Sequence, residues 1–264
     1  ALATLGLRDA RVAAPLDGGS FSVVLIEAAD RSRVVVKEAS GAPPDLFARE
    51  ADGLTLLRSV PAAPRAPEPL AVGATFLVLE YLEPSPRVPR AWENFAGGLA
   101  ALHARIGPAF GAVADNYLGP SPQSNTTTED GHRFFARERL APQLAWARSQ
   151  GWLSDEDVRS GERLMQRLPD LIPAQPASLI HGDLWSGNVI AGPGGALCLI
   201  DPAAHFGWAE ADLAMTTLFG GFSDTFYDTY VAARPFDPGW RDRIPLYNLY
   251  HLLNHLNLFG ASYR

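Results

Sequence analysis

A short stretch in the last third of the chain gathers side chains that can hold a cation and take a proton. It runs from Leu179 to Ala203 and contains Asp183, Asn188 and Asp201 among glycines and apolar residues. Two short strands around the turn 192–195 would place Asn188 and Asp201 almost opposite each other at the open end of a hairpin. An amide oxygen and a carboxylate in that position can share one Mg²⁺ ion, which prefers oxygen ligands.

The letters HGDLWSGN, from His181 to Asn188, match the catalytic-loop pattern of kinases, H-x-D-x-x-x-x-N. On this pattern Asp183 orients the acceptor hydroxyl and takes its proton, while Asn188 and Asp201 hold Mg²⁺ on the nucleotide phosphates. Each residue alone could be an ordinary turn residue, because Asp and Asn favour loops. The spacing of all three favours the catalytic interpretation, and we expect His181 to brace the loop.

Phosphoryl transfer also needs a cation that neutralises the phosphates. Residues 1–82 contain one lysine, Lys37, at the end of the predicted strand 33–39. On the predicted helix that follows, Glu50 interrupts a stripe of leucines, where an unpaired charge would be costly. We therefore predict that Glu50 pairs with Lys37. The alternatives are a lysine on a wet strand face and a glutamate paired with a nearby arginine.

The elements around these residues indicate an α+β protein with two lobes, a bilobal fold like that of protein kinases. Strands are predicted at 21–29, 33–39 and 74–82, with one helix between the last two, and the proline-rich stretch 61–70 is expected to be an extended connection. We predict a small β-rich, nucleotide-binding lobe at residues 1–82 and a larger helical lobe at 83–264 that carries the catalytic loop and the acceptor site. Its predicted helices include 92–106, 132–150, 155–168 and 246–263.

A nucleotide would lie between these lobes. The loop LDGGSFS would cover its phosphates with the backbone N–H groups of Gly18, Gly19 and Ser20. This loop lacks the pattern G-x-G-x-x-G, so an ordinary turn is the alternative. The strand in FLVLEYLEP would end at the hinge, where the backbone from Glu80 to Leu82 would hydrogen-bond the adenine edge.

The composition narrows the class of protein. A net charge of −7 and a pI near 5.4 argue against nucleic acid or an anionic membrane as the main partner. Cys198 is the single cysteine, so no intrachain disulfide can form, which fits a reducing cytoplasm, and we expect this cysteine to be a small buried apolar residue. No stretch is apolar enough for a membrane span and no signal peptide is expected. A monomer is the default assumption.

Several motifs resemble those of small-molecule kinases of the aminoglycoside and choline kinase group, and more closely the fructosamine kinase (ketosamine 3-kinase) family. They are HGDLWSGN, IDPA, EADLAMTTLFGGF, LYNLYHLLNHLNLFGASY, DNYLGPSPQSN and FFARERLAPQL. The resemblance implies ATP-dependent phosphorylation of the sugar 3-hydroxyl of a small or protein-bound ketosamine. This reaction would repair glycated amines, because the phosphorylated product breaks down. It further implies that Trp185 stacks on the sugar and that Asp212 braces the catalytic loop.

Two stretches depart from the family pattern, and both are expected near the acceptor. Trp208 and Ala209 stand where the family often has His-Arg, and TTTEDG at 126–131 replaces a tryptophan-rich stretch. The alternatives to a ketosamine kinase are a kinase of an aminoglycoside or amino alcohol, a non-catalytic kinase-fold binding module, and a metal-dependent hydrolase. A regulated protein kinase is disfavoured, because no A-P-E motif follows Asp201.

Overall fold

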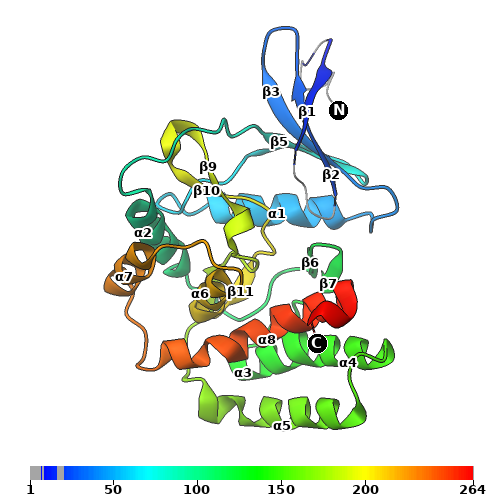
Figure 1. Cartoon of the computed structure of the whole chain (residues 1–264), viewed down its shortest axis with the longest axis vertical. Coiled ribbons are helices and arrows are strands. Elements are labelled where there is room, and N and C mark those ends of the chain that lie inside the picture. Colours follow the sequence, from blue (N-terminus) through cyan, green and yellow to red (C-terminus); the bar gives the residue numbers. More distant parts are fainter. Residues whose placement is uncertain (1–6, 8, 17–20, 264) are drawn as a thin grey trace.

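The computed structural model describes residues 7, 9–16 and 21–263. It has a β-sheet with one helix in the N-terminal part and a mostly helical C-terminal part (Figure 1). This confirms the α+β, two-lobed arrangement that the sequence predicts. The connection at residues 81–90 contains neither helix nor strand, and the lobe boundary after residue 82 stays a prediction.

The N-terminal sheet is antiparallel throughout, with the strand order β1-β2-β3-β5-β4. Its strands are β1 (Arg11–Leu16), β2 (Ser22–Glu27), β3 (Arg33–Glu38), β4 (Pro69–Val72) and β5 (Phe76–Glu80). Side chains alternate between the two faces of a strand. Val34 and Val36 of β3 are therefore buried in an apolar cluster on one face, and Val35 and Lys37 line a cavity on the other.

Two of these strands lie outside the predicted segments. β1 has no predicted counterpart, and β4 begins within the stretch 61–70 that was expected to be an extended connection. Pro69 is tolerated because it is the first residue of an edge strand, where its missing N–H breaks no ladder hydrogen bond. The run of prolines hid this strand from the sequence pattern.

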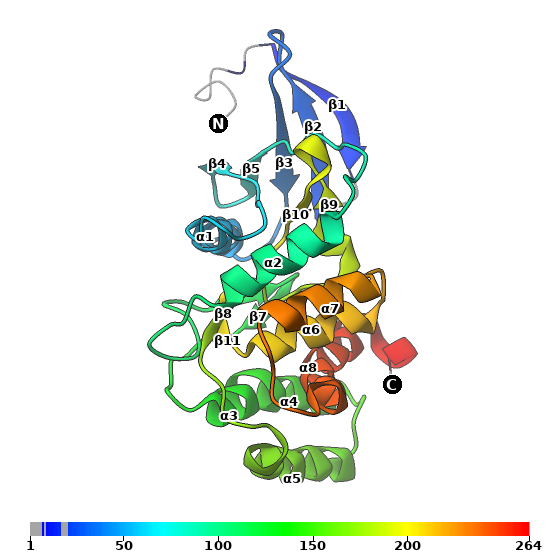
Figure 2. The ribbon, with the colours of Figure 1, turned by 90° about the vertical axis from the view of Figure 1, so that its left-hand side faces the viewer.

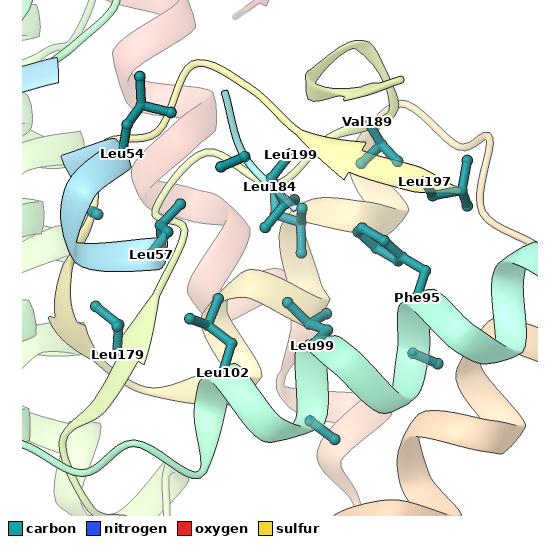
Figure 3. Packing of buried hydrophobic residues seen from close by; sticks show 14 of the residues in the cluster. Leu54, Leu57, Phe95, Leu99, Leu102, Leu179, Leu184, Val189, Leu197 and Leu199 are labelled. Carbon is teal, nitrogen blue, oxygen red and sulfur yellow. The ribbon is translucent and has the colours of Figure 1, made fainter. Parts of the chain in front are cut away.

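Helix α1 (Leu46–Arg58) packs against the sheet and the C-terminal part together. Its leucines at 46, 54 and 57 are buried on one face. They join an apolar cluster that includes Phe95, Leu99 and Leu102 of α2 (Ala91–His103). Figure 3 shows that Leu184, within the catalytic loop at 181–188, points into the same cluster. Burial of this leucine fixes the loop between its two functional ends.

The remaining helices build the C-terminal part, with α5 at the end of the molecule opposite the sheet (Figures 1 and 2). They are α3 (Gly131–Phe134), α4 (Ala141–Ser149), α5 (Asp155–Leu171), α6 (Ala209–Leu218), α7 (Asp224–Ala233) and α8 (Trp240–Phe259). The prediction of one continuous helix at 132–150 is wrong in its middle, where Phe135–Leu140 form a π-helical turn. Pro142 explains this, because it has no N–H to donate to the carbonyl four residues earlier.

Three two-stranded ladders complete the C-terminal part. They are β6 (Asn116–Leu118) with β7 (Ser121–Gln123), β8 (Ser178–Ile180) with β11 (His205–Gly207), and β9 (Val189–Ala191) with β10 (Leu197–Leu199). The last ladder is the hairpin predicted around the turn 192–195, and its register pairs Val189 with Leu199. Cys198 of β10 is buried, as expected. Within the part of the chain that the structure describes, no helix has the length and apolar composition needed to cross a bilayer.

Candidate active site

The ammonium of Lys37 lies between two carboxylates. Its Nζ is 2.7 Å from Glu50 Oε1 and 2.8 Å from Asp201 Oδ1. The predicted pairing with Glu50 is therefore confirmed, and the contact with Asp201 adds a link between the sheet and the catalytic hairpin. Burial alone would lower the pKa of Lys37, but the two carboxylates raise it above its ordinary value, so the ammonium stays charged.

The β9–β10 hairpin places Asn188 and Asp201 at its open end. The N–H of Ile200 donates to the carbonyl oxygen of Asn188 at 3.1 Å, so Asp201 follows one residue beyond the paired position. Asp201 has a φ of 55°, in the left-handed region that aspartate tolerates better than most residues. The near-opposite arrangement predicted for these two residues is thus confirmed to within one residue.

The side chain of Asn188 is hydrogen-bonded to Asp183, at the other end of the loop 181–188. The side-chain Nδ2 of Asn188 donates to Asp183 Oδ2 at 3.0 Å and to its backbone carbonyl at 2.8 Å. Burial raises the pKa of Asp183 to about 7, although the hydrogen bond from Asn188 opposes this rise and the charge of Asp201 adds to it. A carboxylate with such a pKa is suited to accept a proton near neutral pH.

Asp212, on α6, supports the catalytic loop from behind. Its carboxylate accepts hydrogen bonds from the backbone N–H groups of His181 at 2.7 Å and Gly182 at 2.9 Å. Gly182 has a φ of 83°, and a Cβ there would lie 2.2 Å from the carbonyl oxygen of Ala203. The loop therefore needs glycine at this position. The expected bracing contact between Asp212 and the loop is present.

Sequence reasoning missed the next members of this network. His103, at the end of α2, lies with Nε2 3.1 Å from Asp212 Oδ2 and with Nδ1 2.6 Å from the hydroxyl of Tyr230 on α7. Because a carboxylate can only accept, Nε2 carries the proton and Nδ1 accepts from Tyr230. Burial lowers the pKa of His103, which is fully enclosed. The sequence signal that could have revealed His103 is its position among apolar residues of a predicted helix, where a polar side chain needs a buried partner.

The imidazole of His181 is also buried. Its Nε2 donates to the carbonyl oxygen of Ile200 at 2.9 Å, and this contact joins the catalytic loop to the strand that ends at Asp201. Burial lowers the pKa of His181, so the ring stays neutral. These contacts agree with the expected bracing role.

Two cavities meet at Lys37 and Asp201. The sheet-side cavity has a volume of about 740 Å³ and is lined mainly by apolar residues of the sheet, the connection that follows β5, and the β9–β10 hairpin. Glu80 and Leu82, which the sequence predicts to lie at the hinge, are among its lining residues. The side chain of Glu80 is occupied elsewhere, since it forms an ion pair with Arg65. Gly18, Gly19 and Ser20 lie outside the described residues.

The helix-side cavity has a volume of about 920 Å³ and lies on the other side of Lys37 and Asp201. Asp183, Asn188 and Trp185 line it. The indole of Trp185 is 36% exposed and lies over Gly187, where a Cβ would come within 2.2 Å of the ring. The structure therefore brings the proposed base, the proposed metal ligands and the aromatic ring to one cavity.

The two departures from the family pattern lie elsewhere. Trp208 and Ala209 are buried, and Trp208 packs against Phe110, Phe135 and Tyr247 in a separate apolar cluster. Neither they nor residues 126–131 are among the described residues that line the helix-side cavity. Trp208 and Ala209 lie in the interior because α6 turns its first residues inward, and a contact of either stretch with the acceptor stays a prediction.

The donor set at the hairpin fits a magnesium ion. Both side-chain hydrogen bonds described for Asn188 use its nitrogen, so its oxygen is available as a ligand, and the carboxylate of Asp201 is 35% exposed. Within the described ranges no group of three or more His, Cys, Asp and Glu side chains could hold a metal. Two protein oxygens with phosphate oxygens and water are what Mg²⁺ commonly takes.

Comparison with known proteins identifies the family of the chain. The family model described as "Fructosamine kinase" matches residues 6–264. The chain belongs to the fructosamine kinase family. A protein of Synechocystis named "Probable ketoamine kinase" is 42% identical over 83% of this chain and 75% of its own length. "Protein-ribulosamine 3-kinase, chloroplastic" of Arabidopsis thaliana is 33% identical over 94% of this chain and 77% of its own length.

Solved structures agree with this membership. The crystal structure of a candidate fructosamine-3-kinase from Thermobifida fusca has a TM-score of 0.89 and 38% identity, covering 100% of this chain and 94% of that one. A choline kinase of Streptococcus pneumoniae shares the fold alone, with a TM-score of 0.64 and 18% identity over 98% of this chain and 87% of its own. This member of the fructosamine kinase family is thus a kinase that transfers phosphate to a hydroxyl group.

Proposed function

We propose that the protein is an ATP-dependent kinase that phosphorylates the 3-hydroxyl of a ketosamine such as a fructosamine or ribulosamine. One observation carries the proposal. Lys37, Glu50 and Asp201 converge with Asp183 and Asn188 at the junction of the two cavities. Phosphoryl transfer depends mainly on positioning and charge stabilisation, and this junction would supply a fixed cation, metal ligands and a base within one space.

ATP would occupy the sheet-side cavity. The apolar walls suit the adenine ring, and the backbone between Glu80 and Leu82 would bind its polar edge. Lys37, kept in place by Glu50, would hold the phosphates, and the loop with Gly18, Gly19 and Ser20 would cover them. Asn188 and Asp201 would hold Mg²⁺, which neutralises the phosphate charge when bound.

The ketosamine would occupy the helix-side cavity, with its sugar against Trp185. Asp183 would accept the proton of the 3-hydroxyl as the oxygen forms its bond to the γ-phosphorus. The bond between that phosphorus and the bridging oxygen breaks, and ADP leaves. His181 and Asp212 would keep the loop in place without touching the substrate. Loss of the phosphorylated sugar from the amine would then complete a repair of glycated molecules, small or protein-bound.

The names of the relatives support this choice of acceptor. Ketoamine and ribulosamine kinases are among the most similar curated proteins, and Trp185 offers an exposed aromatic face beside the base. We further propose that the protein is a cytoplasmic monomer. Its β-rich lobe would comprise residues 1–82 and its helical lobe residues 83–264.

A panel of acceptors would test it. The purified enzyme, ATP and Mg²⁺ are combined with fructosamines, ribulosamines, an aminoglycoside and choline, and transfer of labelled phosphate is measured for each. We expect turnover well above the ATPase background only with ketosamines. Turnover with the aminoglycoside or choline alone would show that the protein is a kinase of a different acceptor. Transfer to none of the compounds would favour the non-catalytic binding module.

A further inference from the structure

A continuous row of aromatic rings lines the helix-side cavity outward from the proposed base. We define the aromatic row as Trp185, Phe219, His255, Phe259 and Tyr263. Ring centroids are 5.6 Å apart from Trp185 to Phe219, 5.3 Å from Phe219 to His255, and 5.6 Å from His255 to Phe259. Tyr263 closes the row, 5.0 Å from His255 and 5.9 Å from Phe259.

The members of the aromatic row come from three separate places in the chain. Trp185 belongs to the catalytic loop, Phe219 follows the end of α6, and the other three lie at the end of α8 and in the turn after it. The exposed fractions of Phe219 and Phe259 are 42% and 57%. Large rings that stay open to solvent along one wall of a cavity are typical of a surface that binds an apolar group.

Charge is distributed unevenly in this cavity. The acidic side chains among its described lining residues are Glu50, Asp183 and Asp201, at the junction with Lys37. The basic residues of the lining besides Lys37 are His255, within the aromatic row, and Arg49, which is already paired with Asp52 at 3.0 Å. The aromatic row therefore offers rings and no carboxylate, lysine or arginine, which suits an uncharged arm of a ligand.

The structure of a ketosamine connects the charged junction at Lys37 with the aromatic row. Its amine nitrogen is bonded to C1, two carbons from the C3 that carries the reacting hydroxyl. When that hydroxyl meets Asp183 and the phosphate lies at Lys37, the nitrogen and its substituent extend away from the junction. The aromatic row starts at Trp185, two residues from Asp183 in the chain, and forms one part of the remaining lining, while residues 116–120 form another.

We propose that the part of the aromatic row beyond Trp185 is a subsite for the aliphatic arm of the ketosamine amine. This inference rests on the proposed function. Phe219 and Phe259 would set how strongly the length of the arm affects turnover. Full burial of a methylene is worth about 0.8 kcal/mol, which corresponds to a factor of about four in kcat/KM. Contact with a half-exposed wall would give a factor of about two for each methylene. Five added methylenes would then raise kcat/KM about thirtyfold.

The test uses one sugar joined to methylamine, butylamine and hexylamine. We expect kcat/KM to rise about thirtyfold from the methyl to the hexyl compound with the wild-type enzyme. In Phe219→Ala and Phe259→Ala this ratio should fall to below about five. Leu252→Ala is the matched control, because Leu252 is exposed on α8 and is not among the described residues lining the cavity; the ratio should not change.

Calorimetric titration of the same compounds into the wild-type enzyme separates the two hypotheses. Binding that strengthens with arm length, without phosphorylation, would support the subsite and overturn the proposed function. Phosphorylation with no dependence on arm length, or a dependence that survives both alanine substitutions, would overturn the subsite and leave the function intact. Compounds that neither bind nor react would overturn both.

Discussion

Lys37 Nζ lies 2.8 Å from Asp201 Oδ1, although the two residues are 164 positions apart in the chain. Lys37 is the only lysine in the sequence. The contact joins the sheet to the end of the catalytic hairpin at the point where the two cavities meet. A single ammonium thus links the sheet to the hairpin and lies on the wall of both cavities.

Replacement of Lys37 should therefore affect both activity and stability. We expect Lys37→Met to reduce kcat/KM for ATP at least about 10²-fold, because one preorganised donor to transferring charge is lost. The same change should destabilise the fold by about 3 kcal/mol, because it leaves Glu50 buried without its partner. Steady-state kinetics and urea unfolding measure the two effects.

The double variant Lys37→Met with Glu50→Gln is the control for the stability effect. It should be more stable than Lys37→Met alone, because the unpaired buried carboxylate is gone. Equal stability of the single and double variants would show that the unpaired carboxylate of Glu50 is not what destabilises Lys37→Met.

His103 should support catalysis without contacting either substrate. We expect His103→Ala to lower kcat at least about tenfold with little change in either KM, because Asp212 loses a donor and the loop it braces loosens. His103→Gln keeps a donor and should retain more of kcat. Tyr230→Phe removes a single hydroxyl and should cost about 1 kcal/mol of stability. A rise in the KM of both substrates with an unchanged kcat would show that His103 does not position the loop for catalysis.

Acid should destabilise the fold through buried neutral histidines. Burial, helped by His255 and Arg139, lowers the pKa of His251 to about 3, despite the opposing charge of Asp212. An unfolded histidine has a pKa of about 6.5, so between these values only the unfolded state binds the proton. The free energy of unfolding then falls by about 1.4 kcal/mol per pH unit as the pH drops below about 6.5.

His251→Phe keeps a ring of similar size and removes this titration. We expect the pH dependence of the unfolding free energy between about pH 6.5 and 5 to weaken by close to one proton. Urea unfolding at a series of pH values measures this slope. The same slope in the variant and the wild type would mean that His251 is protonated in the folded protein.

The catalytic loop and the Lys37–Glu50 pair were predictable because their signals are local. The spacing within residues 181–188 fixes Asp183 and Asn188 on one loop, and a charge inside an apolar stripe requires a partner. The hairpin register followed from the glycine-rich turn at 192–195 to within one residue.

Other features depend on packing between distant segments. The Lys37–Asp201 contact and the position of His103 behind Asp212 arise only when separate elements meet. Phe219 and Phe259 face the helix-side cavity because α6 and α8 end beside it, which their spacing along the chain does not reveal. The buried position of Trp208 has the same origin, since it depends on how α6 packs against other segments.

The most direct test of the central claim is the identity and rate of the product. Wild-type enzyme with ATP, Mg²⁺ and a fructosamine or ribulosamine should give a phosphate monoester on the sugar O3, identified by phosphorus–proton correlation in NMR. Asp183→Asn, which is nearly the same shape, should form it at least about 10²-fold more slowly while still binding the nucleotide. A monoester at a different hydroxyl, or formation at the wild-type rate in Asp183→Asn, would contradict the account.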